Sequence, residues 1–262
     1  MKFNFLSKSV QNYLINKAST LAEALPYIRQ HTGKNIVIKY GGHAMGNAAL
    51  AKKFSQDIGL IKEVGINPII VHGGGPQIGA MLKKKNIKTK FVEGLRITDK
   101  KTVKIVEKVL SKDINKKIVS DINLTGGKAE SFSGNINSLI QAKKLKIAIK
   151  ESDSNIERIL DLGFVGEPTK INIKKILISI KKGKIPVIAP LGIDKNGNTY
   201  NINADTVAGA VAGALKASKL LLLTDVDGIL DQNNKLISSL SYKEALKIYK
   251  KKYISGGMKP KI

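Results

Sequence analysis

The chain has 262 residues, 42% of them hydrophobic, and its 45 lysines and arginines against 20 aspartates and glutamates give a formal net charge of +25 at pH 7. It contains no cysteine, which excludes disulfides, thiolate metal sites and a cysteine nucleophile. No apolar run approaches the roughly 20 residues that span a bilayer, and the length allows one large α/β domain or two lobes with a substantial core.

The positive charge is almost entirely lysine and is spread along the whole chain. The arginines are only three: Arg29, Arg96 and Arg158. Lysine, asparagine and isoleucine are all abundant and share A/T-rich codons, so we interpret the charge as the result of an AT-rich genome that leaves a solvated lysine surface. We therefore expect neither a nucleic-acid partner nor membrane association. An arginine kept in such a chain suggests a need for a planar, bidentate fork.

The N-terminal residues 3–30 have the periodicity of an amphipathic helix, in which Pro26 is expected near the start of a second helix or at a break. No acidic residue precedes Glu23, which would suit a transit peptide. Because serines are few and the segment leads directly into the first strand, we favour a mature helical extension, residues 1–30, used for packing or oligomerisation.

Two apolar, β-branched strands each run into a glycine-rich turn, in residues 36–42 (IVIKYGG) and 69–75 (IIVHGGG). Bare glycines let a ligand approach the backbone where a Cβ would collide. A helix that begins after such a turn directs its free N–H groups at an anion. Two turns of this kind, one preceded by Lys39, predict a site for two anionic partners, which is the layout that phosphoryl transfer needs.

Helices and strands alternate through the rest of the chain. This order predicts an α/β fold, a three-layer αβα sandwich around a mostly parallel open sheet. Helices are expected near residues 47–64, 76–86, 99–120, 172–181 and 204–217. Further strands are expected at 186–190 and 220–224, with short strands and a hairpin over 129–165.

Several common motifs are absent. The chain has no G-x-x-x-x-G-K-[ST], so a P-loop fold is disfavoured, and residues 73–79 miss the dinucleotide-binding spacing by one residue. The histidines, His31, His43 and His72, lack a ligand spacing such as H-E-x-x-H, so no protein metal site is expected. Either glycine-rich turn alone could equally serve only tight packing.

Six motifs occur in one order along the chain. They are IVIKYGG (36–42), VHGGG (71–75), GLRITD (94–99), YNINAD (200–205), TDVDGIL (224–230) and GGMKPK (256–261). Together they resemble the N-acetylglutamate kinases of the amino-acid-kinase family, in the long plastid and bacterial form with an N-terminal helix. The resemblance covers nearly the whole chain from about residue 20. It implies the amino-acid-kinase fold, with N-acetyl-L-glutamate bound mainly in residues 31–195 and ATP in residues 196–262.

The resemblance assigns catalysis to Lys39 and Lys261, which would flank the γ-phosphoryl group, and to Asp205, which would hold both lysines in place. Asp205 could instead, or also, be the N-cap of a helix over 206–217. Asn203 is expected only to shape the turn.

The resemblance also implies two sets of binding residues. The substrate would be bound by Gly74, Gly75, Arg96 and Asn201, with Arg96 gripping its α-carboxylate through a bidentate pair. ATP would be bound by Gly41, Gly42, Asp225, Gly228, Gly257 and Met258. The simpler interpretation of residues 225–230 is a turn that ends a strand and carries no chemistry.

The implied reaction phosphorylates the side-chain carboxylate of N-acetyl-L-glutamate to N-acetyl-L-glutamyl 5-phosphate, a step of arginine biosynthesis. A carboxylate nucleophile is already ionised at pH 7, so no general base is needed. Magnesium would arrive with ATP, held largely by phosphates and water. The resemblance further implies a homodimer or hexamer, the nitrogen-signalling PII protein as a partner, and a chloroplast stroma, with a bacterial cytoplasm as the alternative.

Three alternatives stay open. Family members continue for a few tens of residues beyond Ile262, so the ATP lobe is expected to be short and the chain could be a truncated, weakly active or regulatory member. It could also be a related acylphosphate-forming kinase. A nucleic-acid binder would show sequence-independent binding that collapses with salt.

Overall fold

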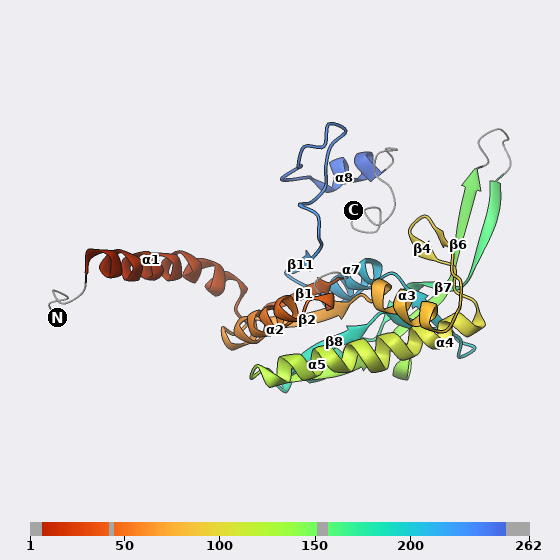
Figure 1. Cartoon of the computed structure of the whole chain (residues 1–262), viewed down its shortest axis with the longest axis horizontal. Helices are drawn as coiled ribbons and strands as arrows, with labels where there is room; N and C mark the ends of the chain where they lie inside the picture. Colours follow the sequence, from red (N-terminus) through yellow and green to blue (C-terminus); the bar gives the residue numbers. More distant parts are fainter. Residues whose placement is uncertain (1–6, 42–44, 151–156, 250–262) are drawn as a thin grey trace.

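Five strands form a parallel sheet in the order β11-β1-β2-β8-β5. The computed structural model describes residues 7–41, 45–150 and 157–249 (Figure 1). The strands are β1 (Asn35–Tyr40), β2 (Asn67–His72), β5 (Ala129–Ser133), β8 (Ile185–Ala189) and β11 (Lys219–Leu222). β-Branched residues dominate β1, β2 and β8, as suits strands buried on both faces.

Helices cover both faces of this sheet. One face carries α2 (Ala48–Glu63), α3 (Gly75–Lys84) and α5 (Asn115–Leu124), and the other carries α6 (Lys174–Lys181) and α7 (Ala204–Leu215). The side chains of β1 alternate accordingly: Ile36 and Ile38 join the first core cluster, whereas Val37 joins the second. The predicted three-layer αβα sandwich is confirmed.

The helix expected near 99–120 consists of three consecutive segments. These are α4 (Lys100–Lys108), a π-helical segment, η2 (Val109–Ile114), and α5 (Asn115–Leu124). Asp99 caps the first segment by accepting a hydrogen bond from the backbone N–H of Thr102 at 2.6 Å. The π-helical segment lies beside the glycine-rich turn that follows β2, because its residues Leu110 and Ile114 pack against Gly74.

A second sheet closes on itself as a four-stranded barrel in the order β10-β7-β6-β9. Its strands are β6 (Ile140–Lys150), β7 (Glu157–Ile171), β9 (Leu191–Ile193) and β10 (Thr199–Ile202), and a short 3₁₀ turn, η3 (Ile136–Ser138), precedes β6. The hairpin expected within 129–165 is present as β6 and β7, but its strands are long rather than short, and β7 continues to Ile171. A two-stranded hairpin, β3 (Phe91–Val92) with β4 (Leu95–Arg96), stands between α3 and α4.

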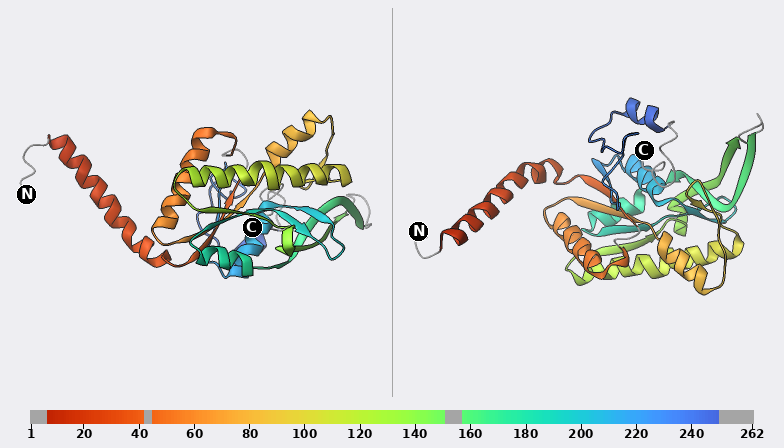
Figure 2. Two further views of the ribbon diagram at one scale, coloured as in Figure 1. Left: turned by 90° about the horizontal axis from the view of Figure 1, so that it is seen from below. Right: turned by 45° about the horizontal axis from the view of Figure 1, so that its top comes forward.

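The N-terminal helix α1 (Lys8–His31) extends away from the rest of the molecule (Figures 1 and 2). The expectation of a break at Pro26 was wrong, because the helix continues through this residue. Strong helix formers such as Ala22, Ala24 and Leu25 precede the proline and favour the helix around it. No residue of α1 is buried. Its use in packing or oligomerisation stays a prediction.

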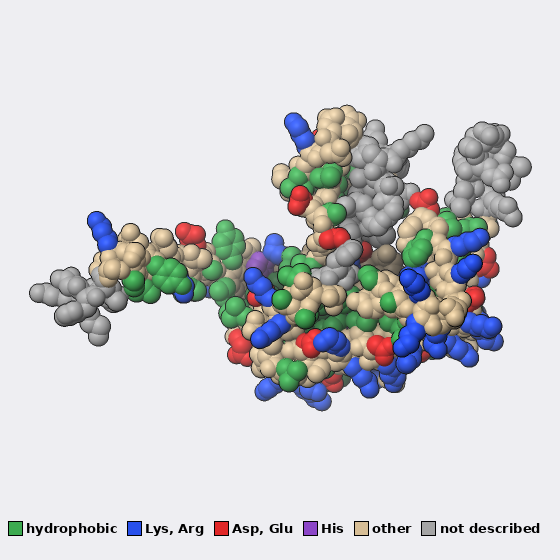
Figure 3. Space-filling view, in the orientation of Figure 1, with side chains coloured by type: hydrophobic (Ala, Val, Ile, Leu, Met, Phe, Trp, Pro, Cys, Tyr) green, Lys and Arg blue, Asp and Glu red, His purple; other side chains and the backbone are tan. Residues whose placement is uncertain are grey.

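The helix α8 (Tyr242–Tyr249) is the last element described. Among the described residues, no helix is long and apolar enough to cross a membrane. Lysine and arginine side chains are spread along the lower and right-hand parts of the visible face, with acidic side chains among them (Figure 3).

Candidate active site

One cavity of about 210 Å³ gathers side chains from both halves of the chain. It lies at the carboxyl ends of β1 and β2, where ligands bind in open parallel sheets. Six of the expected site residues line it: Lys39, Gly74, Gly75, Arg96, Asn201 and Asp205. Positions far apart in sequence, from four of the six motifs, thus meet at one place.

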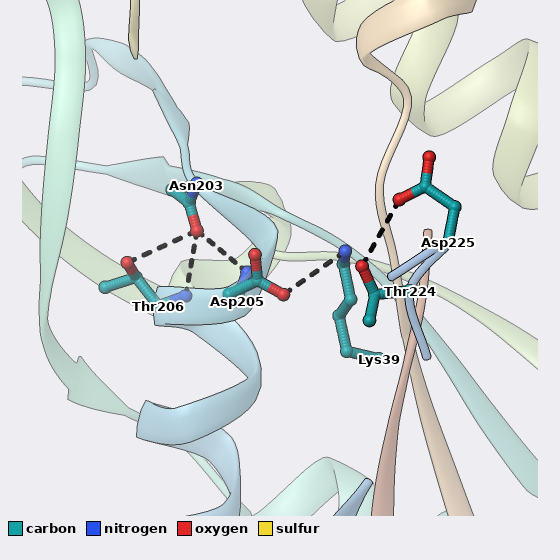
Figure 4. A network of polar contacts seen from close by, with 6 residues as sticks. All are labelled: Lys39, Asn203, Asp205, Thr206, Thr224 and Asp225. Atoms are coloured by element: carbon teal, nitrogen blue, oxygen red, sulfur yellow. Dashed lines mark hydrogen bonds and ion pairs between the residues drawn. The ribbon is translucent and has the colours of Figure 1, made fainter. Parts of the chain in front are cut away.

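Lys39 and Asp205 form an ion pair at this cavity, with Nζ 3.2 Å from Oδ1 (Figure 4). Lys39 lies near the end of β1, and Asp205 lies in the first turn of α7. Both residues are buried, at 9% and 7% exposure, so their opposite charges compensate each other where water has little access. The pair holds an ammonium group in a fixed position beside the cavity.

The N-cap of α7 is Asn203, not Asp205. The Asn203 side chain accepts hydrogen bonds from the backbone N–H groups of Asp205 (2.8 Å) and Thr206 (3.1 Å). This satisfies two of the free donors at the helix start and leaves the Asp205 carboxylate for Lys39. The N-cap interpretation of Asp205 was therefore wrong, and Asn203 does more than shape a turn.

Gly41 leaves room for the Lys39 side chain. A Cβ on Gly41 would lie 2.6 Å from Lys39 Nζ and 3.3 Å from the carbonyl oxygen of Leu223. A side chain here would displace the ammonium group or the backbone after β11. Glycine at position 41 therefore allows the Lys39 side chain to keep its position beside Asp205.

Arg96 is held in place from two sides. Its Nη1 donates to Thr89 Oγ1 at 2.7 Å, its Nη2 donates to the carbonyl oxygen of Gly75 at 3.2 Å, and its guanidinium lies 4.5 Å from the ring centroid of Phe91. Burial lowers the pKa of Arg96 from its usual value, which still leaves the group protonated. A fixed guanidinium of this kind suits a carboxylate ligand.

Asn201 stands on β10 across the cavity from the hairpin. Its Nδ2 lies 3.5 Å from Thr98 Oγ1, and the Thr98 hydroxyl donates to the carbonyl oxygen of Arg96 at 2.8 Å. This chain of contacts links the barrel to the arginine. The second N–H of the Asn201 amide and its carbonyl oxygen suit a polar ligand in the cavity.

Residues expected to bind ATP are only partly described. Asp225 follows β11 and accepts a weak hydrogen bond from Thr224 Oγ1 at 3.4 Å, on the far side of Lys39 from Asp205 (Figure 4). Gly228 has φ +150°, where other residues are strained, and a Cβ there would lie 2.8 Å from Leu236 Cδ1. Four expected residues lie outside the described part of the chain: Gly42, Gly257, Met258 and Lys261.

The sequence analysis did not identify Phe91 as a site residue. The feature that would have identified it is the short hairpin of β3 and β4, in which Phe91 pairs directly with Arg96. The ring provides a flat support for the guanidinium. In the described ranges, no group of three or more histidines and carboxylates is arranged to hold a metal ion.

A parallel α/β sheet with a buried lysine–aspartate pair, a fixed arginine and glycine-rich turns at its carboxyl edge has the architecture of an enzyme acting on small anionic substrates. The chain belongs to the amino acid kinase family, whose profile matches residues 34–262.

Relatives within this family are acetylglutamate kinases. The chain is 52% identical over 248 residues to "Acetylglutamate kinase" of Parvibaculum lavamentivorans, covering 95% of this chain and 82% of the relative. It is 55% identical over 246 residues to the enzyme of the same name from Rhizobium rhizogenes, covering 94% and 83%.

Solved structures share the fold. The crystal structure of smu.665 from Streptococcus mutans UA159 has a TM-score of 0.74 at 31% identity and covers 87% of this chain and 86% of that one. An N-acetylglutamate synthase structure from Neisseria gonorrhoeae has a TM-score of 0.76 at 23% identity, covering 93% of this chain and 53% of that one, which is a likeness of fold alone.

Proposed function

We propose that this kinase transfers the γ-phosphoryl group of ATP to the side-chain carboxylate of N-acetyl-L-glutamate, forming N-acetyl-L-glutamyl 5-phosphate in arginine biosynthesis. The observation that carries the proposal is the single cavity in which the Lys39–Asp205 pair and Arg96 meet. The identity of 52–55% to acetylglutamate kinases over most of the chain supports the choice of substrate.

Within the cavity, each residue has a role that its chemistry supports. Arg96 binds the α-carboxylate of the substrate, and the backbone N–H groups of Gly74 and Gly75 bind its anionic groups. Asn201 donates to the substrate through its amide. Lys39 stabilises the charge that develops on the transferred phosphoryl group, and no general base is required.

The remaining roles concern ATP. Asp205 orients Lys39, and in this proposal it also orients Lys261. The glycines Gly41 and Gly42 bind the phosphates of ATP, and its binding site is lined by Asp225, Gly228, Gly257 and Met258. Magnesium accompanies ATP as its phosphate complex rather than occupying a protein-only site.

The proposed division into lobes places the amino-acid substrate in residues 31–195 and ATP in 196–262. Gly74, Gly75 and Arg96 support this, but Asn201 lines the same cavity, so the second segment also contributes to the substrate site. The pairing of Thr199 with Ile193 joins the two segments within the barrel.

For the assembly we propose a homodimer or hexamer, with α1 available for packing and the PII protein as a candidate partner. For localisation, composition favours a chloroplast stroma. The relatives reported above are bacterial, which supports a bacterial cytoplasm as the alternative.

The function is tested by measuring ADP release by the purified chain with ATP, magnesium and N-acetyl-L-glutamate. We expect turnover that requires the acetylated substrate, fails with glutamate and is abolished in Lys39→Ala. A folded chain that binds ATP and N-acetylglutamate without turnover would favour a regulatory member of the family. Turnover with another carboxylic acid in preference would favour a related acylphosphate-forming kinase.

A further inference from the structure

Asn115 is a fully buried polar side chain that joins the helix layer to the sheet. Its Nδ2 lies within hydrogen-bond distance of three acceptors: the carbonyl oxygens of Val187 (2.9 Å) and Phe132 (3.2 Å), and Nε2 of His72 (3.1 Å). Carbonyl oxygens can only accept, so the amide nitrogen must face the sheet. The orientation of Asn115 is therefore fixed by the backbone of β5 and β8.

The carbonyl oxygen of Gly73 determines the tautomer of His72. Because this oxygen can only accept, the ring proton is on Nδ1, which donates to it at 2.8 Å, and Nε2 is left as an acceptor 3.1 Å from the Asn115 amide, which supports the ring. The ring is fully buried at the end of β2, and burial lowers the pKa of His72 to about 4. The imidazole is thus neutral at physiological pH, with one defined donor.

The hydrogen bond from His72 sets the direction of the next peptide group. In a trans peptide the C=O and N–H point in opposite directions, so a Gly73 carbonyl turned to His72 directs the Gly74 N–H away from it. Gly74 is a buried residue that lines the substrate cavity, and within the described residues its N–H donates to no protein acceptor. A backbone donor without a protein acceptor, in the same cavity as Arg96 and Lys39, suits an anionic ligand.

The π-helical segment places these groups together. Leu110 and Ile114 both contact Gly74: a Cβ on this glycine would lie 2.6 Å from Leu110 Cδ2 and from Ile114 Cδ1. In an α-helix, residue 115 would lie roughly 140° around the axis from residue 110. The i→i+5 pattern of a π-helix brings Leu110, Ile114 and Asn115 to one face, and π turns often occur at functional sites.

We propose that Asn115 is a positioning residue that acts through His72 to hold the Gly74 N–H toward the bound N-acetylglutamate. The inference rests on the proposed function. It assigns a role to a buried asparagine, a buried histidine and a π turn that form one connected unit.

The test compares steady-state kinetics of the wild-type chain with Asn115→Leu, His72→Leu and His72→Asn. A charge-assisted bond from a backbone N–H accounts for roughly 10-fold to 100-fold in affinity, so both leucine variants should raise KM for N-acetylglutamate by at least about tenfold. KM for ATP should change by less than about twofold. His72→Asn retains a donor near the position of Nδ1, so its KM should lie close to the wild-type value.

Ser179→Ala is the matched control. Ser179 is also buried and donates to Glu130 Oε2 at 2.6 Å, but it does not line the substrate cavity, so its loss should lower stability without changing either KM. If Asn115→Leu does not fold, Asn115→Ser replaces it, and the His72 pair gives the same comparison independently.

The inference is overturned if the leucine variants lower stability while the ratio of the two KM values stays at the wild-type level. It is also overturned if His72→Asn behaves like His72→Leu. These results differ from failure of the proposed function, which would appear as no turnover of N-acetylglutamate by the wild-type chain and would overturn both.

Discussion

Lys39 Nζ and Asp205 Oδ1 lie 3.2 Å apart although their residues come from the first strand of the sheet and from a helix near the end of the described chain. The contact joins β1 to α7 and fixes a positive charge at the cavity. Removing one partner of a buried ion pair takes away a compensating charge where water has little access. This relationship therefore affects both activity and stability.

Asp205→Asn keeps the size of the side chain but removes its charge. We expect turnover to fall by about 100-fold, since Lys39 loses the group that orients it, and the free energy of unfolding to fall by about 3 kcal/mol. Steady-state kinetics and urea unfolding measure the two effects. Asp121→Asn is the control, because Asp121, half-buried on α5, pairs with the exposed Lys117, and loss of this pair should cost no more than about 0.5 kcal/mol. Equal effects of the two changes would contradict the special role of the buried pair.

Arg96→Lys retains the positive charge but loses the planar fork. We expect KM for N-acetylglutamate to rise by about 10-fold to 100-fold with KM for ATP unchanged, because the bidentate contact and the stacking on Phe91 are both lost. Arg29→Lys, on the exposed end of α1, should leave both values unchanged. An unaltered KM in Arg96→Lys would show that this arginine does not bind the substrate.

Gly74→Ala places a methyl group against Leu110 and Ile114, whose nearest atoms are both 2.6 Å from the added Cβ. We expect destabilisation by about 1–3 kcal/mol from overpacking, with loss of substrate binding. Gly209→Ala is a suitable comparison, since nothing lies within 4 Å of its Cβ position. Within α7 this second change should stabilise by about 0.5–1 kcal/mol. Thermal or urea unfolding distinguishes the two variants, because Gly74→Ala should lower the free energy of unfolding and Gly209→Ala should raise it.

His72 should make stability depend on pH in a defined direction. Its pKa is about 4 in the folded chain against 6.5 for the free side chain, so the unfolded state binds the proton first as pH falls. The contribution of His72 to the free energy of unfolding, about 3 kcal/mol, is therefore fully present above about pH 6.5. It is lost progressively as the pH falls to about 4.

Urea unfolding between these pH values measures that loss, and His72→Asn, which has no titrating ring, isolates it from the carboxylates. The difference in unfolding free energy between wild type and His72→Asn should shrink as the pH falls. A difference that stays constant over this range would contradict a neutral, buried histidine.

The sheet and its helices could be predicted because local patterns determine them. β-Branched runs such as those in residues 36–40 and 68–72 indicate buried strands, and the order of elements implies parallel pairing. The closed barrel could not be predicted, because it depends on long-range pairs such as Gln141 with Ile193. The π turn was also missed, because a 3.6-residue period continues on both sides of it.

Most of the described site was predicted from motifs, yet its supporting residues were not. A lone asparagine among lysines, as at Asn115, has the pattern of an exposed polar position, and His72 was considered only as a metal ligand. Their importance depends on burial and on contacts with Phe132 and Val187, which come from other strands. Asn203 and Asp205 show the same limit, since the pattern could not distinguish the cap from the ion-pair partner.

The position of β1 also has a consequence for the order of folding during synthesis. Lys39 pairs with Val71 of β2 on one side and with Leu222 of β11 on the other. The first neighbour is translated soon afterwards, but β11 is the last of the described strands to emerge from the ribosome. Contacts between such distant segments form slowly, because a long loop must close first. The nascent chain therefore carries Lys39 on an open sheet edge until translation has passed β11, so this side of β1 is completed late in synthesis.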